Sequence, residues 1–137
     1  MPSPSLHEVS VQDIQLELIR RSRHNAFDGE LVHKSLLKHR ALWEAVLLDR
    51  QGIANYRTPG GLLVTGPIKL RDLPHNHWNA DTLFVLTVSP AAARELAEVA
   101  KRDGWGGELQ LHEDRDETDN ALGGGPRDYG LLSVWWD

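Results

Sequence analysis

The sequence predicts an α+β fold in one domain, with an N-terminal helical pair, a mixed β-sheet of five or six strands and one βαβ crossover helix. Three observations support this expectation. Residues 82–88 form a short, β-rich apolar run that ends at Ser89-Pro90. Residues 89–104 have helical spacing and are followed by the alternating run 108–112. Residues 10–50 repeat apolar side chains every three or four positions, as amphipathic helices do.

The first part of the chain is expected to be helical after a disordered lead, residues 1–9. Ser10 has the features of a helix N-cap, and the first helix is expected to end near residues 24–25. Asp28 begins a second helix that is predicted to continue to about Arg50, with Phe27 stapled onto its first turns. That helix would be about 22 residues, or roughly 33 Å, long. The two helices would form an αα-hairpin or a helix-turn-helix-like corner.

The middle of the chain is predicted to form strands. Residues 53–57 and 62–65 read as a hairpin around the turn signal Thr58-Pro59-Gly60-Gly61. Residues 68–71 alternate apolar and basic side chains, which is typical of an edge strand. Residues 73–80 read as a loop. Residues 82–88 are apolar on both faces, so this strand is expected in the interior of the sheet, covered on both sides.

The last third is predicted to contain the crossover. Ser89 caps a helix with Pro90 in its first turn, and Gly104 ends it. Residues 108–112 alternate cleanly, so strand, helix and strand would give a right-handed parallel crossover. Residues 113–128 read as an acidic, then glycine-rich, loop, and residues 129–136 as a final strand.

Composition limits the possible classes of protein. The net charge is −5, and it is uneven: residues 1–58 hold eight Lys/Arg and seven Asp/Glu, whereas residues 59–137 hold seven and thirteen. An acidic chain has no general attraction for nucleic acid or anionic lipid. The absence of cysteine suits a reducing cytoplasm and removes any disulfide framework. No apolar run approaches the roughly 20 residues of a membrane span, so we expect no membrane insertion.

One candidate site is a metal site. His75 and His77 would share one side of an extended segment, with Asp81 close by. Imidazole and carboxylate ligands suit a divalent transition metal such as Zn, Fe or Mn. The string His75-x-His77-x-x-x-Asp81, followed by an apolar run, resembles the first metal motif of the cupins, which implies a metal held by these residues. It departs from that family in having Asp81 in place of glutamate and a helix after residue 88. The alternative is a polar loop without metal, and we predict no cofactor.

A second candidate is a partner-binding surface, which could also serve a homodimer. The acidic segment contributes Asp114, Asp116, Glu117 and Asp119, which suit contact with a basic partner. The alternative is a solvated acidic loop with no partner. Trp135 and Trp136 are adjacent in a strand and must point to opposite faces. Both are buried if both faces are covered; otherwise one marks an interface.

A third, weaker candidate is nucleic-acid binding by the basic side chains of the helical pair, namely Arg20, Arg21, Arg23, Lys34, Lys38 and Arg40. The alternative is that cations near the helix ends only complement the helix dipole. The sequence contains no motif for nucleophilic catalysis. We therefore expect a small, non-catalytic interaction or regulatory protein, with enzyme activity undecided.

Overall fold

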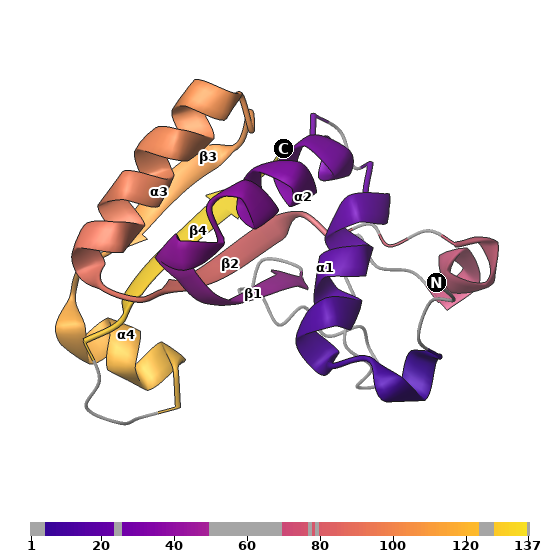
Figure 1. Cartoon of the computed structure of the whole chain (residues 1–137), viewed down its shortest axis with the longest axis horizontal. Helices are drawn as coiled ribbons and strands as arrows, with labels where there is room; N and C mark the ends of the chain where they lie inside the picture. The colour runs from indigo at the N-terminus through magenta and orange to yellow at the C-terminus, as the bar shows by residue number, and fades with distance from the viewer. Residues whose placement is uncertain are drawn as a thin grey trace, which may run out of the picture.

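The computed structural model describes residues 5–23, 26–49, 70–76, 78, 80–123 and 128–136. The described residues form an α+β fold with four α-helices and four strands (Figure 1). In chain order these are α1 (Val11–Arg21), α2 (Gly29–Lys38), β1 (Trp43–Asp49), β2 (Thr82–Thr87), α3 (Pro90–Asp103), β3 (Glu108–His112), α4 (Arg115–Ala121) and β4 (Gly130–Trp135). Short 3-10 turns add η1 (Leu6–Glu8), η2 (Arg40–Leu42) and η3 (Leu70–His75).

The strands form one sheet in the order β1-β2-β4-β3, and every neighbouring pair is antiparallel. The predicted mixed sheet of five or six strands is therefore wrong for the described residues. The crossover from β2 through α3 to β3 exists, and β2 and β3 run parallel, but β4 is inserted between them. Sequence could not place β4 there, because strand order depends on contacts between distant segments. The predicted hairpin, residues 53–57 and 62–65, lies outside the described residues.

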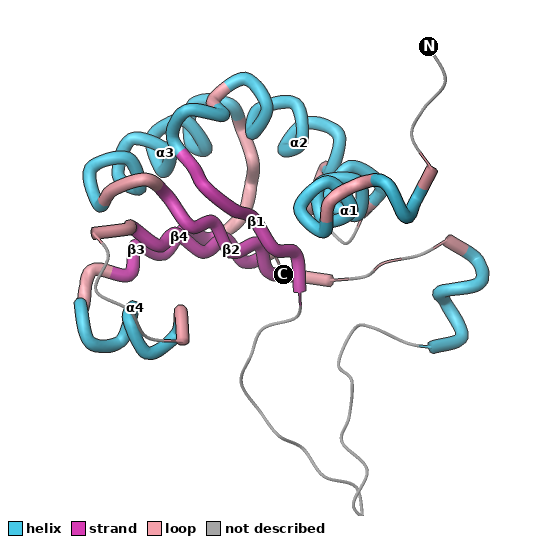
Figure 2. The backbone as a smooth tube through the Cα atoms, turned by 60° about the horizontal axis from the view of Figure 1, so that its bottom comes forward, coloured by secondary structure: helices cyan, strands magenta, loops and turns pink. Residues whose placement is uncertain are grey.

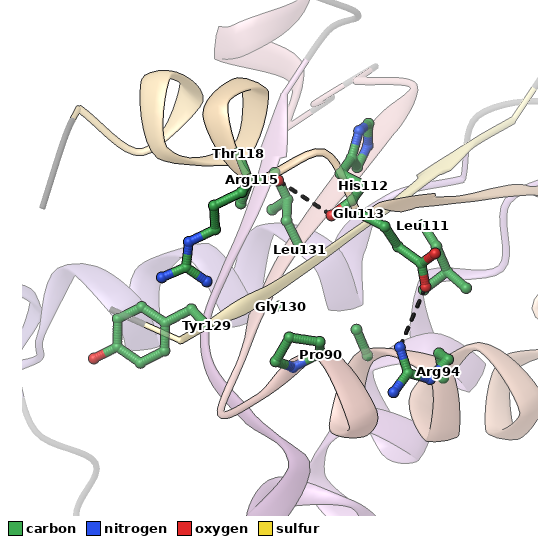
Figure 3. A pocket seen from close by; sticks show the side chains of 11 residues that line it. Pro90, Arg94, Leu111, His112, Glu113, Arg115, Thr118, Tyr129, Gly130 and Leu131 are labelled. Atoms are coloured by element: carbon green, nitrogen blue, oxygen red, sulfur yellow. Dashed lines mark hydrogen bonds and ion pairs between the residues drawn. The ribbon is translucent and has the colours of Figure 1, made fainter. Parts of the chain in front are cut away.

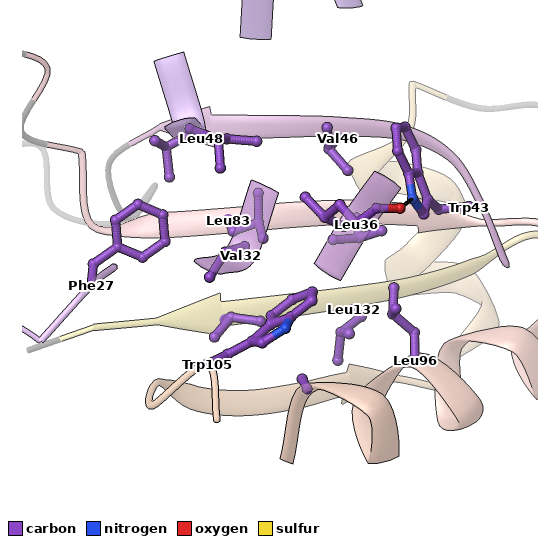
Figure 4. Packing of buried hydrophobic residues seen from close by; sticks show 14 of the residues in the cluster. Phe27, Val32, Leu36, Trp43, Val46, Leu48, Leu83, Leu96, Trp105 and Leu132 are labelled. Atoms are coloured by element: carbon purple, nitrogen blue, oxygen red, sulfur yellow. Dashed lines mark hydrogen bonds between the residues drawn. The ribbon is translucent and has the colours of Figure 1, made fainter. Parts of the chain in front are cut away.

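The helices divide unequally between the two faces of the sheet. Figure 2 shows α1, α2 and α3 on one face, which we call the first face, and α4 on the other, the second face. Buried side chains from the first-face helices and the sheet form one apolar cluster (Figure 4). Its largest members include Trp43, Trp105, Trp136, Leu36 and Leu83. Burying a side chain of this size contributes about 1.5–3 kcal/mol, so this cluster dominates the stability of the fold.

The predicted helix starts are confirmed at three places. The Ser10 hydroxyl accepts the amide of Asp13 at 3.0 Å, and the Asp28 carboxylate accepts the amide of Leu31 at 3.2 Å. The Ser89 hydroxyl does the same for the amide of Ala92 at 3.0 Å. Each bond satisfies a backbone donor that has no partner inside the helix. Gly104 adopts φ +73° at the end of α3, as the sequence predicted.

The long second helix predicted to reach Arg50 is wrong. α2 ends at Lys38, and after η2 the chain continues as β1. Val46 and Leu48 alternate with Ala45 and Leu47, and the first pair is buried in the core. The segment is so rich in apolar residues that it fits a helical stripe and a two-residue alternation equally well. Pairing with β2 decides in favour of the strand.

Three other expectations need correction. Residues 113–128, predicted as a loop, contain α4, which Asp114 begins by accepting the amide of Glu117 at 3.0 Å. Of the predicted edge strand 68–71, residues 68–69 lie outside the described residues, and residues 70–71 belong to the 3-10 turn η3, which also covers the start of the predicted loop 73–80. The predicted disordered lead, residues 1–9, includes η1. α4 and the two 3-10 turns have no regular spacing of apolar residues, which is why the sequence did not predict them.

The outer edge of β1 is closed by glutamine side chains of α1. The Gln12 amide donates to the carbonyl of Val46 at 3.0 Å and accepts the Val46 amide at 2.9 Å. The Gln15 carbonyl accepts the amide of Leu48 at 3.0 Å. These side chains take the place of a neighbouring strand, so β1 does not offer unpaired backbone groups there. Among the described residues, each helix is too short or too polar to cross a bilayer.

Candidate functional site

The second face of the sheet is apolar although only one short helix lies on it. Side chains alternate along each strand, so Leu47 of β1, Phe84 and Leu86 of β2, and Leu131 of β4 point away from the core formed with α1–α3. Phe84 and Leu86 are half-buried, and Leu47 is 42% exposed. The expectation that β2 is an interior strand is confirmed, because it lies between β1 and β4. Its second face is less completely covered than predicted.

The helix α4 forms one wall of a hollow on this face. Thr118 anchors it: the side chain is buried, and its hydroxyl donates to the carbonyl of His112 at 3.1 Å. Leu122, just after α4, is 38% exposed. The space left between α4 and the sheet is a hollow of about 450 Å³. Its walls are mainly apolar, from Leu47, Phe84, Leu86, Leu122 and Leu131, with His112, Glu117 and Thr118 at the α4 side.

The border of the hollow is acidic where α4 lies. Asp114, Asp116, Glu117 and Asp119 all belong to α4 or its cap, and Arg115 is the one cation in this segment. Arg115 pairs with Asp119 at 3.5 Å and with Asp128 at 3.1 Å. Glu117 lines the hollow itself and is exposed. Of the four predicted acidic partner-binding residues, Glu117 lines the apolar hollow, Asp114 caps α4, Asp119 pairs with Arg115, and Asp116 lies exposed on α4.

The two predicted tryptophans are separated by the sheet. Trp136 is a core residue: it is 1% exposed, its indole donates to the carbonyl of Trp105 at 2.8 Å, and its ring meets Phe27 at 4.1 Å between centroids. Trp135 lies on the second face and is half-buried. Its indole nitrogen is buried without an acceptor among the described residues. Only Trp135 could therefore contribute to a surface on the second face.

A serine and a histidine meet at the edge of the hollow, although sequence reasoning singled out neither. The Ser133 hydroxyl and His112 Nε2 lie 2.8 Å apart. Such a pair can activate a serine nucleophile when donors for the developing oxyanion are close by. Ser133, however, lies in β4, which pairs with β2 on one side and β3 on the other. The backbone amides next to Ser133 are therefore used in the sheet and are not free to bind an oxyanion. The pair therefore acts as a diagonal cross-strand hydrogen bond.

The predicted metal ligands are only partly described. His75 is exposed at the end of η3, and Asp81 accepts the Thr82 hydroxyl at 2.8 Å. His77 lies outside the described residues. Within the described part of the chain, no group of three or more potential ligands is placed to hold a metal ion. The triad that includes His77 stays a prediction.

The basic side chains of the helical pair are largely engaged by neighbours. Arg20 and Arg21 both bond to Glu17, each through Nε at 2.9 Å. Arg23 pairs with Glu30 at 3.1 Å, and Arg40 stacks over the ring of Trp43 at 3.9 Å. Lys34 and Lys38 lie apart from these, beside Asp103 in a small hollow of about 230 Å³. The six residues do not form one continuous cationic surface, and nucleic-acid binding stays a prediction.

The Glu17 cluster gives a testable pH dependence. Hydrogen bonding to Arg20, opposed by burial and helped by Arg21, lowers the pKa of Glu17 from 4.5 to about 2. A lowered folded-state pKa stabilises the protein above the unfolded value, and this stabilisation is lost as the pH falls from about 4.5 toward 2. Because the side chain is 40% exposed, screening reduces the effect to about 1 kcal/mol or less.

We expect Glu17→Gln to flatten the fall of unfolding free energy between about pH 4.5 and pH 2, as measured by urea titration at low salt. Repeating the series at high salt should shrink the difference from the wild type. Parallel curves for the wild type and Glu17→Gln at low salt would contradict this assignment.

A smaller hollow of about 220 Å³ opens at the end of the sheet, between α3 and the start of α4 (Figure 3). Arg94, Glu113, Arg115 and Tyr129 line it. Arg94 pairs with Glu113 at 3.3 Å, and Arg115 pairs with Asp119 and Asp128. The arginines are thus neutralised by carboxylates of this chain, and we assign no anion site here.

A larger hollow, about 620 Å³, lies between α1 and η3, with Leu6, Ile14, Leu18, Leu73 and Trp78 among its walls. Some of its walls come from residues next to those that the structure does not describe: Leu6 lies near residues 1–4, and Asn76 and Trp78 flank residue 77. The hollow on the second face is formed by regular strands and α4. We therefore take the latter as the candidate site.

The chain was compared with protein families, curated proteins and solved structures. No family model, no curated protein and no solved structure matches it.

Proposed function

We propose that this protein is a non-catalytic interaction protein that binds a basic, amphipathic helical segment of a protein partner on the second face of its sheet. One observation carries the proposal: an apolar hollow of about 450 Å³ lies beside an acidic helix. Isolated exposed apolar side chains are common on proteins, but a continuous apolar depression with a polar border is typical of a binding surface.

The shape of the hollow favours a helical segment. Its apolar walls come from three strands and the end of α4, so an occupant must present several apolar side chains on one side. A helix does this with residues three, four and seven positions apart, and grooves of this kind bind helices in many proteins. Leu47 and Phe84 are cross-strand neighbours on the sheet, Leu122 follows α4, and all three line the hollow where the apolar side of that helix would lie.

The charge beside the hollow favours a basic occupant. Glu117 of α4 lines the hollow, and Asp116 and Asp119 lie beside it on the same helix. Lysine or arginine side chains at the border of the bound helix would meet these carboxylates, whereas acidic side chains would be repelled. Charges at the border of an interface mainly set its specificity and its association rate.

The proposal predicts selective binding of a model peptide. The probe is a fluorescent helical peptide with leucine on one face and lysine on the other, compared with the same peptide carrying glutamate in place of lysine. We expect binding of the lysine peptide only, measured by fluorescence anisotropy. Leu47→Asp should weaken it roughly tenfold or more, as expected for a charge placed in the apolar centre of an interface.

Matched variants test the position of the site. Leu37→Asp introduces the same charge at an exposed leucine of α2, on the opposite side of the molecule, and should leave binding unchanged. Glu117→Lys should weaken binding by roughly two- to fivefold, as border charges do, whereas Glu98→Lys on α3 should not. Equal binding of both peptides, or equal effects of Leu47→Asp and Leu37→Asp, would refute the proposal.

A further inference from the structure

The two edge strands of the sheet differ in their protection. The edge of β1 is closed by Gln12 and Gln15 of α1. At the other edge, β3 pairs with β4 on its inner side, and no described strand pairs with its outer side. An unpaired edge of this kind is a template for pairing with another strand.

The backbone groups of β3 that face outward can be identified from the register. The amide of Trp136 donates to the carbonyl of Asp81 at 3.0 Å, so the even-numbered residues of β4 bond to β2. The odd-numbered residues of β4 therefore bond to β3, opposite Glu108, Gln110 and His112. Because bonding alternates along a strand, Leu109 and Leu111 direct their N–H and C=O groups outward.

The sequence of β3, Glu108-Leu109-Gln110-Leu111-His112, is complementary to itself when two copies run antiparallel. We propose that β3 pairs with β3 of a second copy about a two-fold axis through Gln110. Leu109 then lies opposite Leu111 of the second copy, and these are the residues whose backbone groups face outward. Glu108 lies opposite His112 of the second copy, so the carboxylate meets an imidazole at both ends.

Other registers are less favourable. A shift by two residues in one direction places Leu109 opposite Glu113 of the second copy, and a shift in the other places Leu111 opposite Gly107. Both replace a leucine pair with a mismatched one. In the proposed register, Leu109 and Leu111, which are half-buried at the border of the core, gain apolar neighbours. Opposed leucines and an opposed Glu–His pair are favourable cross-strand combinations.

The pairing would join two sheets into one of eight strands. Cross-strand neighbours share a face, so the second faces of both copies would lie on the same side of the continuous sheet. A partner with two basic segments could then contact two hollows at once. The β3 pairing does not depend on the proposed function of the hollow, and its tests involve no peptide.

A disulfide test reads the register directly. The chain has no cysteine, so Gln110→Cys introduces a single thiol at an exposed position. Two such residues at the axis form a non-hydrogen-bonded pair with Cα atoms about 4.5 Å apart, within disulfide range. We expect rapid conversion to a covalent dimer under mild oxidation, and slow conversion for Glu98→Cys on the exposed side of α3. Equal rates for the two variants would overturn the proposal.

A charge exchange provides an independent test. His112→Glu opposes two carboxylates at each end of the strand pair, and Glu108→Lys replaces each Glu–His pair with a Lys–His pair. A mixture of the two variants instead forms one Lys–Glu pair and one Glu–His pair. Sedimentation equilibrium should show concentration-dependent dimers for the wild type, roughly tenfold weaker association for each variant alone, and recovery in the mixture. A wild type that stays monomeric over roughly a hundredfold range of concentration, or a mixture no more associated than its components, would overturn the proposal.

Discussion

Replacing Gly29 with alanine is expected to leave the protein largely unfolded. Gly29 is the first residue of α2, where alanine is normally the better helix former by about 0.5–1 kcal/mol. Here the added methyl group has no space. A Cβ atom at this position would overlap the carbonyl oxygen of Ile19 and lie 2.6 Å from that of Ser22. Both obstacles are backbone atoms, which cannot rotate away as a side chain can.

The close approach has a structural purpose. The amide of Gly29 donates to the carbonyl of Ser22 at 3.1 Å, so the start of α2 is bonded directly to the end of α1. The Ser22 hydroxyl in turn donates to the carbonyl of Trp78 at 3.2 Å. To make room for a methyl group, α1 and α2 must separate and this corner must open. We expect a loss of more than about 4 kcal/mol, a large part of the stability of a protein of this size.

The measurement is urea unfolding followed by circular dichroism, with Glu30→Ala as the matched control. Glu30 is the next residue along, exposed, and paired with Arg23 at 3.1 Å. Its replacement should cost less than about 1 kcal/mol, because exposed ion pairs contribute little. If Gly29→Ala proved as stable as Glu30→Ala, the two helices could not be as close as described.

Gly29 also shows what the sequence could and could not reveal. Asp28-Gly29 predicts a helix start, since a capping carboxylate acts on residues three positions away. The contact of Gly29 with Ile19 and Ser22 depends on how two helices pack, and no local pattern predicts it. The same difference between local patterns and contacts of distant segments holds elsewhere in the chain. The caps at Ser10 and Ser89 and the start of β2 at Thr82 follow from neighbouring residues, and the structure agrees with these predictions.

The larger errors have the same origin. The sequence predicts helix for β1 because its apolar residues fit both periods, and only its pairing with β2 resolves the choice. α4 was missed because its sequence, Arg-Asp-Glu-Thr-Asp-Asn-Ala, has no apolar stripe, and Thr118 is held by the carbonyl of His112. The acidic half of the candidate surface was therefore visible in the sequence. The apolar half, including Leu47 and Leu122, required the positions of β1 and α4.

The second large effect is expected at Trp105, which joins three separate parts of the core. Its ring is 2% exposed, and its indole donates to the Ser35 hydroxyl at 2.9 Å. The Ser35 hydroxyl donates onward to Asp103 at 2.6 Å, and this bond lowers the pKa of the Asp103 carboxyl. The carbonyl of Trp105 accepts the indole of Trp136. Through these bonds Trp105 connects α2, the end of α3 and the end of β4.

Trp105→Ala should therefore lower the free energy of unfolding by about 3–5 kcal/mol, the usual cost of removing a large buried aromatic side chain. Trp105→Phe keeps most of the packing but leaves Ser35 without its donor, and should cost about 1–3 kcal/mol. Trp135→Ala is the matched control, because that ring is half-buried on the second face. Its removal should cost less than that of Trp105.

A double-mutant cycle separates the hydrogen bond from the packing. Ser35→Ala removes the acceptor of the indole and the donor to Asp103 together, so Trp105→Phe and Ser35→Ala should not be additive. We expect a coupling free energy of about 0.5–3 kcal/mol from urea unfolding of the four proteins. Strict additivity would mean that the indole and the hydroxyl do not interact in solution. The contribution of Trp105 to stability would then come from its packing alone, without the chain of bonds that leads from α2 to Asp103.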